Sequence, residues 1–292
     1  MRKFALLTNF NFYEKVQAAR QVADRLEEAG GEILIAAFNR EKLIRAGIHR
    51  DSFQYLPMDA LYEEADALIV LGGDGTILET ARRASVCNKP ILGVNLGRLG
   101  FMAELDLNEL SYLPRLINDD FWIETRAMLR VELLSERGEP RSFCHALNDA
   151  TISNGSISRI IDLSLSENGS PVTTYRADGL IVATPTGSTA YSMSAGGAIV
   201  DPAVPAFCVT PICPHSFAAR PLIFSDASTL EIKNVCVREK MLFLTVDGRM
   251  NFEVYRNQTV RITKSEQITK LIRFKQNGFY QKFCRKMREA HF

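Results

Sequence analysis

One aspartate lies inside a glycine-rich segment, where its carboxylate could take part in chemistry. The segment, GGDGT at residues 72–76, contains Asp74 and follows the continuous apolar run at residues 67–71. Residues 77–86 then show the apolar spacing of a helix. Glycines let the backbone approach a ligand closely, and a helix N-terminus presents free N–H groups that favour phosphate. Thr76 is expected to cap this helix, with Glu79 in the capping-box position.

The carboxylate of Asp74 needs an explanation, because a negative charge repels phosphates. It could bind a magnesium ion that bridges phosphates, or accept a proton from an attacking hydroxyl. The alternative is that Gly-Asp-Gly is only a tight turn. The segment is neither a Walker A loop nor a G-x-G-x-x-G motif. Since a predicted strand precedes it and a predicted helix follows, we favour phosphoryl-transfer chemistry.

A second polar pair, Asn148-Asp149, lies between apolar residues in a strand-like context. Both residue types are poor strand formers. A carboxylate can accept both hydroxyls of a ribose diol, and the adjacent amide can hydrogen-bond a base. A β-bulge or a turn explains the pair equally well.

A third segment, TPTGSTAYSMSAGG at residues 184–197, is rich in small polar residues: nine of its fourteen residues are Thr, Ser or Gly. Small hydroxyl side chains and exposed N–H groups suit phosphate and sugar contacts. Tyr191 could stack on a base. The alternative is a polar Ω-loop without a ligand. The segment NLGRLGF at residues 95–101 follows another predicted strand and could close the same crevice as the glycine-rich turn.

The elements that position these residues change in character along the chain. Residues 1–120 alternate strand and helix patterns, which predicts an α/β domain with a doubly wound parallel sheet and ligands at the carboxyl ends of its strands. From about Trp122 the pattern changes to short β-branched or alternating segments separated by turns such as Asn168-Gly169. Residues 121–267 are therefore expected to form an all-β, β-rich domain.

Composition excludes several classes of protein. The 292 residues are 46% hydrophobic and 24% charged, which is typical of a globular protein of about two domains. No apolar run reaches the roughly 18 residues of a membrane helix, and no secretory signal is evident, so a cytoplasmic protein is expected. The six cysteines show no paired spacing and are expected to be reduced.

Charge is unevenly distributed although its formal sum is +1. Seven basic residues oppose one acidic residue, Glu289, between residues 270 and 292, so the rest of the chain is acidic. An acidic main body argues against a nucleic-acid binder. The basic segment itself is expected to be a solvated terminal helix or strand rather than a polyanion-binding tail.

Taken together, these motifs resemble those of the NAD kinase family. The resemblance rests on GGDG at residues 72–75, on Asn148-Asp149, on residues 184–197 and on residues 95–104, and it is weak before residue 60. The GGDG motif alone also occurs in lipid kinases and phosphofructokinases, so residues 184–197 are the specific match.

The resemblance implies transfer of a phosphoryl group from ATP or polyphosphate to the 2′-hydroxyl of the adenosine ribose of NAD, with a divalent cation, most simply Mg²⁺. Asp74 would be the general base. It also implies that residues 268–292 return to the first domain and that the chain forms a homodimer or homotetramer, without nucleic-acid or membrane partners. The residues expected to contact nucleotide are Gly73, Asp74, Gly75, Asn148, Asp149, Arg159, Arg176, Asp178, Thr189, Ala190, Tyr191, Ser192, Met193, Ser194 and Arg249.

Two residues depart from the family's pattern, and two other functions stay open. Asp149 stands where many members have Glu, and Arg249 where many have Gln, which leaves one dinucleotide contact in doubt. A lipid kinase of the diacylglycerol or sphingosine type would share GGDG but needs an apolar pocket. A dinucleotide-binding regulator without catalysis would have no use for Asp74 among phosphates.

Overall fold

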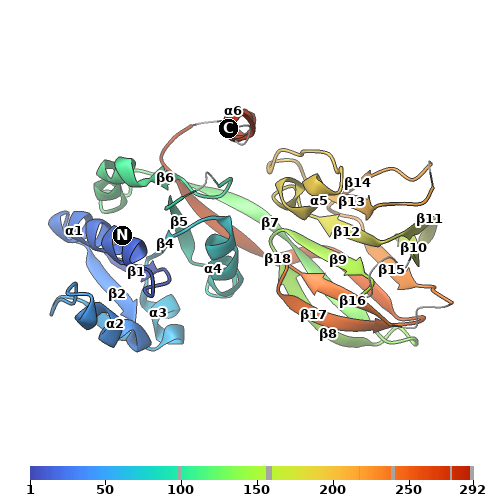
Figure 1. Ribbon diagram of the computed structural model, residues 1–292, viewed down its shortest axis with the longest axis horizontal. Coiled ribbons are helices and arrows are strands. Elements are labelled where there is room, and N and C mark those ends of the chain that lie inside the picture. The colour runs from blue at the N-terminus through green and yellow to red at the C-terminus, as the bar shows by residue number, and fades with distance from the viewer. Residues whose placement is uncertain (98–99, 156–159, 217, 238–240, 277, 290–292) are drawn as a thin grey trace. The chain divides into compact units, whose positions relative to one another are not determined.

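The computed structural model describes residues 1–292 except 98–99, 156–159, 217, 238–240, 277 and 290–292 (Figure 1). The chain forms two compact units. Unit 1 comprises Met1–Thr125 and Thr269–Phe292, and unit 2 comprises Arg126–Ile268. Two long strands, β7 (Trp122–Leu134) and β18 (Thr259–Arg273), carry the chain from one unit into the other.

Unit 1 is built on a parallel sheet with the strand order β3-β2-β1-β4-β5. The strands are β1 (Lys3–Leu7), β2 (Glu32–Ala36), β3 (Gln54–Leu56), β4 (Ala67–Leu71) and β5 (Pro90–Asn95). The free edge of β5 pairs with the end of β18, through Lys270 and Leu271, and with β6 (Leu105–Asp106). All five residues of β4 are buried, as its uninterrupted apolar sequence predicts.

The helices of unit 1 connect these strands, except for α6, which follows the last strand of the chain. They are α1 (Tyr13–Glu28), α2 (Arg40–Arg45), α3 (Met58–Glu64), α4 (Asp74–Val86) and α6 (Phe279–Glu289), with the 3₁₀ helices η1 (Ala37–Asn39) and η2 (Leu107–Leu116). Helix α1 buries Val16, Ala19, Val22 and Leu26, the apolar face that its sequence predicts. Helix α4 packs closely on β5 because Gly93 leaves room for Ile77: a Cβ on that glycine would lie 2.5 Å from Ile77 Cδ1.

Strand order in this sheet reverses between β1 and β4. In doubly wound folds the crevice at such a reversal, outside the carboxyl ends of the strands, is the usual ligand site. The residues that follow β4 are those of the glycine-rich turn, and Thr8, just after β1, donates its hydroxyl to Leu71 O at 2.9 Å. The fold therefore places residues 72–76 at the expected ligand crevice of unit 1.

Unit 2 consists of antiparallel strands in two layers. One layer has the order β14-β13-β12-β9-β16-β17, with β14 (Leu222–Ser225), β13 (Ala206–Ile212), β12 (Gly179–Ala183), β9 (Asp149–Ser153), β16 (Met241–Val246) and β17 (Met250–Tyr255). The other contains β11 (Ser170–Ala177), β10 (Ile161–Glu167), β15 (Leu230–Asn234) and β18, together with β7 and β8 (Pro140–Ala146). Leu163 and Ile232 of the second layer share one buried cluster with Val182 and Leu244 of the first.

The predicted fold class is confirmed: a mostly parallel α/β unit and a unit of antiparallel strands. The Asn168-Gly169 turn joins β10 to β11 with positive φ at both residues, +50° and +80°. No helix in the described part of the chain is long and apolar enough to cross a membrane.

Candidate active site

Helix α4 starts at Asp74, three residues before the start that the sequence pattern predicts. Gly73 is the N-cap and has an extended backbone, and its carbonyl accepts the N–H of Thr76 at 2.9 Å. The prediction that Thr76 caps the helix with Glu79 is therefore wrong. Thr76 lies inside the first turn, where its side chain takes the space above Gly72. A Cβ on that glycine would come within 2.5 Å of Thr76 Oγ1, so the close turn requires glycine.

The carboxylate of Asp74 is held by backbone groups of the following loop. Phe101 N–H donates to Oδ2 at 2.8 Å and Met102 N–H donates to Oδ1 at 3.0 Å. Gly100 lies so close that a Cβ there would be 2.2 Å from Asp74 Oδ1. Because each carboxylate oxygen has two lone pairs, these two bonds orient Asp74 without using all of its acceptor capacity.

A pocket of about 530 Å³ opens beside this carboxylate. Its lining comprises Lys15, Gly72, Gly73, Asp74, Asn95, Leu96, Gly97, Gly100 and Lys286. Asp74 is the one carboxylate among these residues, and Lys15 and Lys286 supply positive charge. Such a pocket, with glycine backbone, a helix N-terminus and two lysines, suits a phosphate chain.

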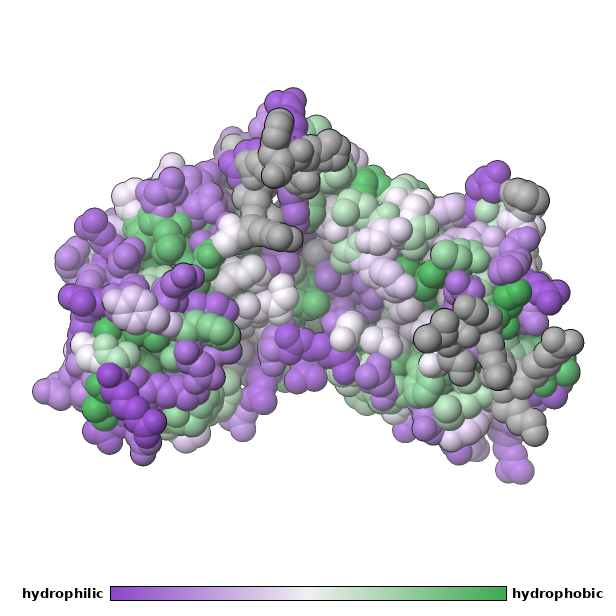
Figure 2. All heavy atoms as spheres, in the orientation of Figure 1, coloured by the Kyte–Doolittle hydropathy of each residue, from purple (hydrophilic) through white to green (hydrophobic). Residues whose placement is uncertain are grey.

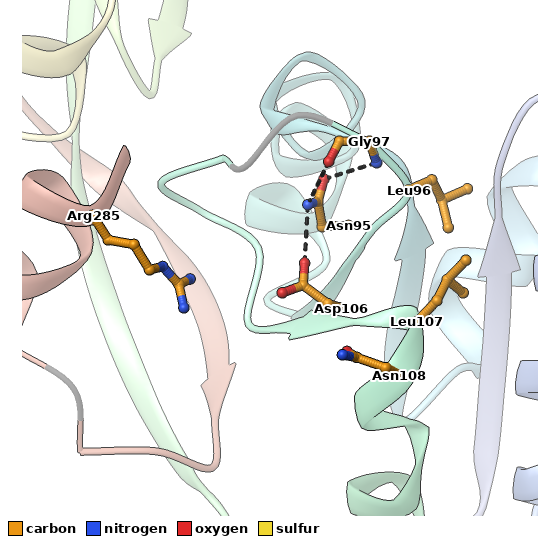
Figure 3. A pocket seen from close by; sticks show the side chains of 7 residues that line it. All are labelled: Asn95, Leu96, Gly97, Asp106, Leu107, Asn108 and Arg285. Atoms are coloured by element: carbon orange, nitrogen blue, oxygen red, sulfur yellow. Dashed lines mark hydrogen bonds between the residues drawn. The ribbon is translucent and has the colours of Figure 1, made fainter. Parts of the chain in front are cut away.

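A neighbouring pocket of about 550 Å³ shares Asn95, Leu96 and Gly97 with the first (Figure 3). The Asn95 amide donates to Asp106 Oδ1 and to Gly97 O, both at 3.0 Å, and so fixes the loop that follows β5 (Figure 3). Arg285 of α6 lines this pocket.

In unit 2, Asn148 lies just before β9 and Asp149 begins that strand. The backbone N–H groups of Leu147, Asn148 and Asp149 all donate to the carboxylate of Asp247, at 2.9, 2.8 and 3.1 Å. Asp247 has a φ of +49° in the turn between β16 and β17. Its buried carboxylate therefore fixes the backbone that presents Asn148 and Asp149.

The carboxylate of Asp149 is buried beside that of Asp247. Burial, followed by the negative charge of Asp247, raises the pKa of Asp149 to about 6, and a hydrogen bond from Thr151 opposes the shift. Burial also raises the pKa of Asp247, against the effect of its three N–H donors. A strongly shifted carboxyl beside a second one is the kind of group found at functional sites.

Residues 184–197 form two short helices, η3 (Gly187–Thr189) and α5 (Tyr191–Ser194), rather than an open loop. The Thr184 hydroxyl donates to Leu147 O at 2.6 Å, and the Thr184 N–H donates to Asn148 O at 2.8 Å. A Cβ on Gly187 would be 2.1 Å from Asn148 O. The segment is therefore packed directly against the Asn148-Asp149 pair, as a shared site requires.

The side chains of this segment divide into two sets. Ser188 and Ser192 are fully buried, and the Ser192 hydroxyl is 3.0 Å from that of Thr210, so it holds the fold together. Thr189 donates its hydroxyl to Thr186 O. Tyr191, which is 48% exposed, and Ser194 face solvent, and Ala190 and Met193 are half-buried. In this conformation, a ligand can be contacted by the backbone and by the side chains of Ala190, Tyr191, Met193 and Ser194.

The remaining predicted residues are more scattered. Arg176 and Asp178 are exposed at the junction of β11 and β12, where their backbones bond to His215 and Ile212. Arg249 is exposed in the turn between β16 and β17. Arg159 lies outside the described residues. Unit 1 thus groups Gly73, Asp74 and Gly75, and unit 2 groups Asn148 and Asp149 with residues 184–194.

Two groups of side chains had no role in the sequence analysis. Asp247 supports the Asn148-Asp149 backbone, and its position in an Asp-Gly turn between two alternating strands was the available signal. Lys15 and Lys286 line the Asp74 pocket, but nothing local to either lysine indicates a ligand. The basic segment that begins at residue 270 comprises the end of β18 and helix α6, where a solvated helix or strand was expected. Lys282, Phe283 and Lys286 are half-buried, so the helix is not fully solvated.

Family models match most of the chain. The ATP-NAD kinase N-terminal domain matches residues 4–121, and the ATP-NAD kinase C-terminal domain matches residues 147–274. The chain is 43% identical to an NAD kinase of Carboxydothermus hydrogenoformans over 80% of this chain and 83% of that protein. It is 36% identical to an NAD kinase of Caldanaerobacter subterraneus over 99% of this chain and the whole of that protein.

Solved structures of NAD and NADH kinases also resemble this chain. Yeast NADH kinase complexed with NADH superposes with a TM-score of 0.85 at 25% identity, covering 99% of this chain and 87% of that one. An NAD kinase from Archaeoglobus fulgidus in complex with ATP superposes with a TM-score of 0.73 at 26% identity, covering 99% of both chains.

Proposed function

We propose that this chain, which belongs to the NAD kinase family, transfers a phosphoryl group from ATP to the 2′-hydroxyl of the adenosine ribose of NAD and so produces NADP. The observation that carries the chemistry is the carboxylate of Asp74, oriented by two N–H donors at a glycine turn where the sheet reverses its strand order. A carboxylate in a phosphate-binding turn has a use in catalysis but none in phosphate binding alone.

Asp74 is the proposed general base. The 2′-hydroxyl gives its proton to an Asp74 carboxylate oxygen as the ribose oxygen attacks the γ-phosphorus, and the bond to the leaving ADP oxygen breaks. A ribose hydroxyl is a weak nucleophile, so positioning it in line with the γ-phosphoryl group supplies most of the acceleration. The hydrogen bonds from Phe101 and Met102 fix the direction from which the hydroxyl approaches.

A divalent cation, most simply Mg²⁺, is part of the proposal. Asp74 is the one carboxylate among the described residues that line its pocket, and as the base it would not serve as a ligand, so the ion would be held by the donor phosphates and water. When bound, such an ion offsets phosphate charge and orients the donor. No group of three or more His, Cys, Asp or Glu side chains suited to a metal occurs among the described residues, which is consistent with an ion that arrives with the nucleotide.

Unit 2 supplies the proposed dinucleotide contacts. Asn148 would bind a base through its amide and Asp149 the hydroxyls of a ribose, on a backbone held by Asp247. Tyr191 offers an exposed ring for stacking on a base. Contacts through Arg159, Arg176, Asp178, Thr189 and Arg249 are part of the proposal, and Ser192 would contribute through its backbone because its hydroxyl is used inside the fold. A homodimer or homotetramer and a cytoplasmic location are also part of it.

The test is an acceptor survey. Purified protein is incubated with ATP, magnesium and one acceptor at a time (NAD, NADH, AMP or diacylglycerol), and NADP is detected with an NADP-specific dehydrogenase. We expect NADP from NAD. Phosphatidate from diacylglycerol would replace the proposal with lipid kinase activity, and tight NAD binding without turnover would replace it with a regulator. Substituting polyphosphate for ATP identifies the donor.

A further inference from the structure

Helix α6 lies beyond both regions that the family models match, since the second match ends at residue 274. Its sequence, FYQKFCRKMRE at residues 279–289, contains four basic residues. Figure 2 shows hydrophilic side chains at the surface of this helix, at the top of the view. Lys286 and Arg285 of this helix line the two pockets described above.

An ion pair and a ring contact are among the interactions that hold α6 against the rest of unit 1. Lys282 donates from Nζ to Glu104 Oε2 at 3.1 Å, and the Glu104 side chain is fully buried. The Phe283 ring stacks on Phe101 with 6.1 Å between ring centroids. Phe101 is also the residue whose N–H binds Asp74 Oδ2. The helix is therefore anchored directly to the loop that orients the proposed base.

This anchoring carries Lys286 to the Asp74 pocket. Its Nζ lies 3.8 Å from the centroid of the Phe101 ring, and its side chain lines the pocket together with Lys15 of α1. Burial lowers the pKa of Lys286, while the charge of Asp74 opposes that shift. Among the described residues no carboxylate forms an ion pair with Lys286, and a partly desolvated ammonium group without such a partner favours an incoming anion.

We infer that Lys286, with Lys15 from α1, binds the terminal phosphates of the donor beside the glycine turn. The inference rests on the proposed function, because it assumes that residues 72–75 receive the donor. Lysine binds phosphate as a point charge, and two such charges offset the repulsion between Asp74 and the triphosphate. Arg285, the preceding residue on α6, lines the adjoining pocket and adds positive charge there (Figure 3).

The kinetic test uses Lys286→Met, which keeps an apolar stem against Phe101. Its matched control is Arg288→Met, which removes the same charge from an exposed position on the same helix. We expect Lys286→Met to lower kcat/KM for ATP by about 10- to 100-fold, as loss of a charged phosphate contact does, with KM for NAD changed by less than ~2-fold. Lys286→Arg should restore most of the loss. An equal effect of both charge removals, or none from Lys286→Met, would overturn the inference.

A second measurement needs no variant and no turnover. Amine-reactive labelling of the wild-type chain, followed by mass spectrometry, is compared with and without inorganic tripolyphosphate. Lys286 and Lys15 should become protected, and Lys233, exposed on β15, should not. Unchanged labelling of Lys286 at saturating tripolyphosphate contradicts the inference. If the protein makes no NADP but Lys286 is still protected, the proposed function fails and the phosphate site stands.

Discussion

At the scale of single residues, the site depends on how tightly one carboxylate is held. Asp74 is oriented by N–H groups of Phe101 and Met102, and Gly100 packs against its oxygens. A side chain that rotates freely would lose most of the advantage of a nearby base, because small misplacements of reacting groups are costly.

Gly100→Ala tests this packing. The new Cβ would meet Asp74 Oδ1 at 2.2 Å, so the carboxylate or the loop must move. We expect kcat to fall by about 10- to 100-fold, the cost of a displacement near 1 Å. Gly278→Ala is the control, since its Cβ meets no atom within 4 Å. Steady-state kinetics with saturating NAD and ATP give the comparison, and equal kcat values for both variants would show that the contact does not position Asp74.

Asp149→Asn tests the buried carboxyl in unit 2. Because the pKa of Asp149 is raised to about 6 in the fold, the native state binds more protons than the unfolded chain between about pH 4 and pH 6, so stability falls as pH rises through that window. Because Asp149→Asn cannot titrate at this position, its stability lacks this dependence on pH. Its Tm relative to wild type should increase from pH 4 to pH 6 and then level off, while its affinity for NAD decreases.

Thermal unfolding at a series of pH values measures this difference, with Asp178→Asn as an exposed control. A Tm difference that does not vary with pH would mean that Asp149 titrates normally. Isothermal calorimetry with NAD gives the affinity, and unchanged binding would leave Asp149 with a structural role only.

At the scale of elements, sequence patterns predicted the strands and most helices that carry the site. The apolar run of β4 and the spacing after it indicate strand, turn and helix because these signals are local. The start of α4 was misplaced because it depends on the extended backbone of Gly73 and on the contact of Gly72 with Thr76. The support of Asn148 by Asp247 spans 99 residues, and no local pattern contains it.

The anchor of α6 is the second feature at this scale. Glu104 accepts the N–H groups of Phe274 and Lys275 at 3.0 Å, and also accepts from Arg273 and Lys282. One buried carboxylate thus joins the end of β18 to α6. Its partners are distant in sequence, so the motif at residues 95–104 does not reveal this role.

Glu104→Gln removes the charge while keeping the size of the side chain. Lys282 would then lose its counter-charge, while Arg273 would keep Glu124 at 2.7 Å. Breaking a buried ion pair typically costs 3–5 kcal/mol. We expect the free energy of unfolding to fall by about that amount in urea titrations. Glu64→Gln, which removes a half-exposed partner of Lys3, should change it by less than ~1 kcal/mol. If the two variants changed the free energy of unfolding by similar amounts, Glu104 would not be the residue that anchors α6.

At the scale of the whole molecule, the two units have separate groups of candidate ligand residues, around Asp74 in one and around Asp149 in the other. Composition and strand patterns predicted their classes because an alternating βα order and a series of short strands are long-range regularities. The individual contacts of a bound dinucleotide are not readable in the same way, since hydroxyls such as that of Ser192 match the pattern but are used inside the fold.

Regiochemistry tests the proposed acceptor. NAD can make binding contacts beyond the reacting ribose that AMP lacks, and this remote binding energy supports the reaction, so AMP should be a poor acceptor. We predict a product that carries phosphate at the adenosine 2′ position alone. Phosphorus NMR of the product shows which hydroxyl carries the new phosphate. A 3′-phosphate, or efficient phosphorylation of AMP, would contradict the proposal.

The most direct test of the central claim is the turnover of Asp74→Asn. The variant keeps the size of the side chain and an oxygen that can accept the N–H of Phe101 or Met102. The account predicts that the fold is kept, with a lower Tm because one N–H loses its acceptor, and that the NAD dissociation constant stays near that of wild type. It predicts a kcat lower by at least ~100-fold because the proton acceptor is gone. NADP formation by Asp74→Asn at close to the wild-type rate would contradict it.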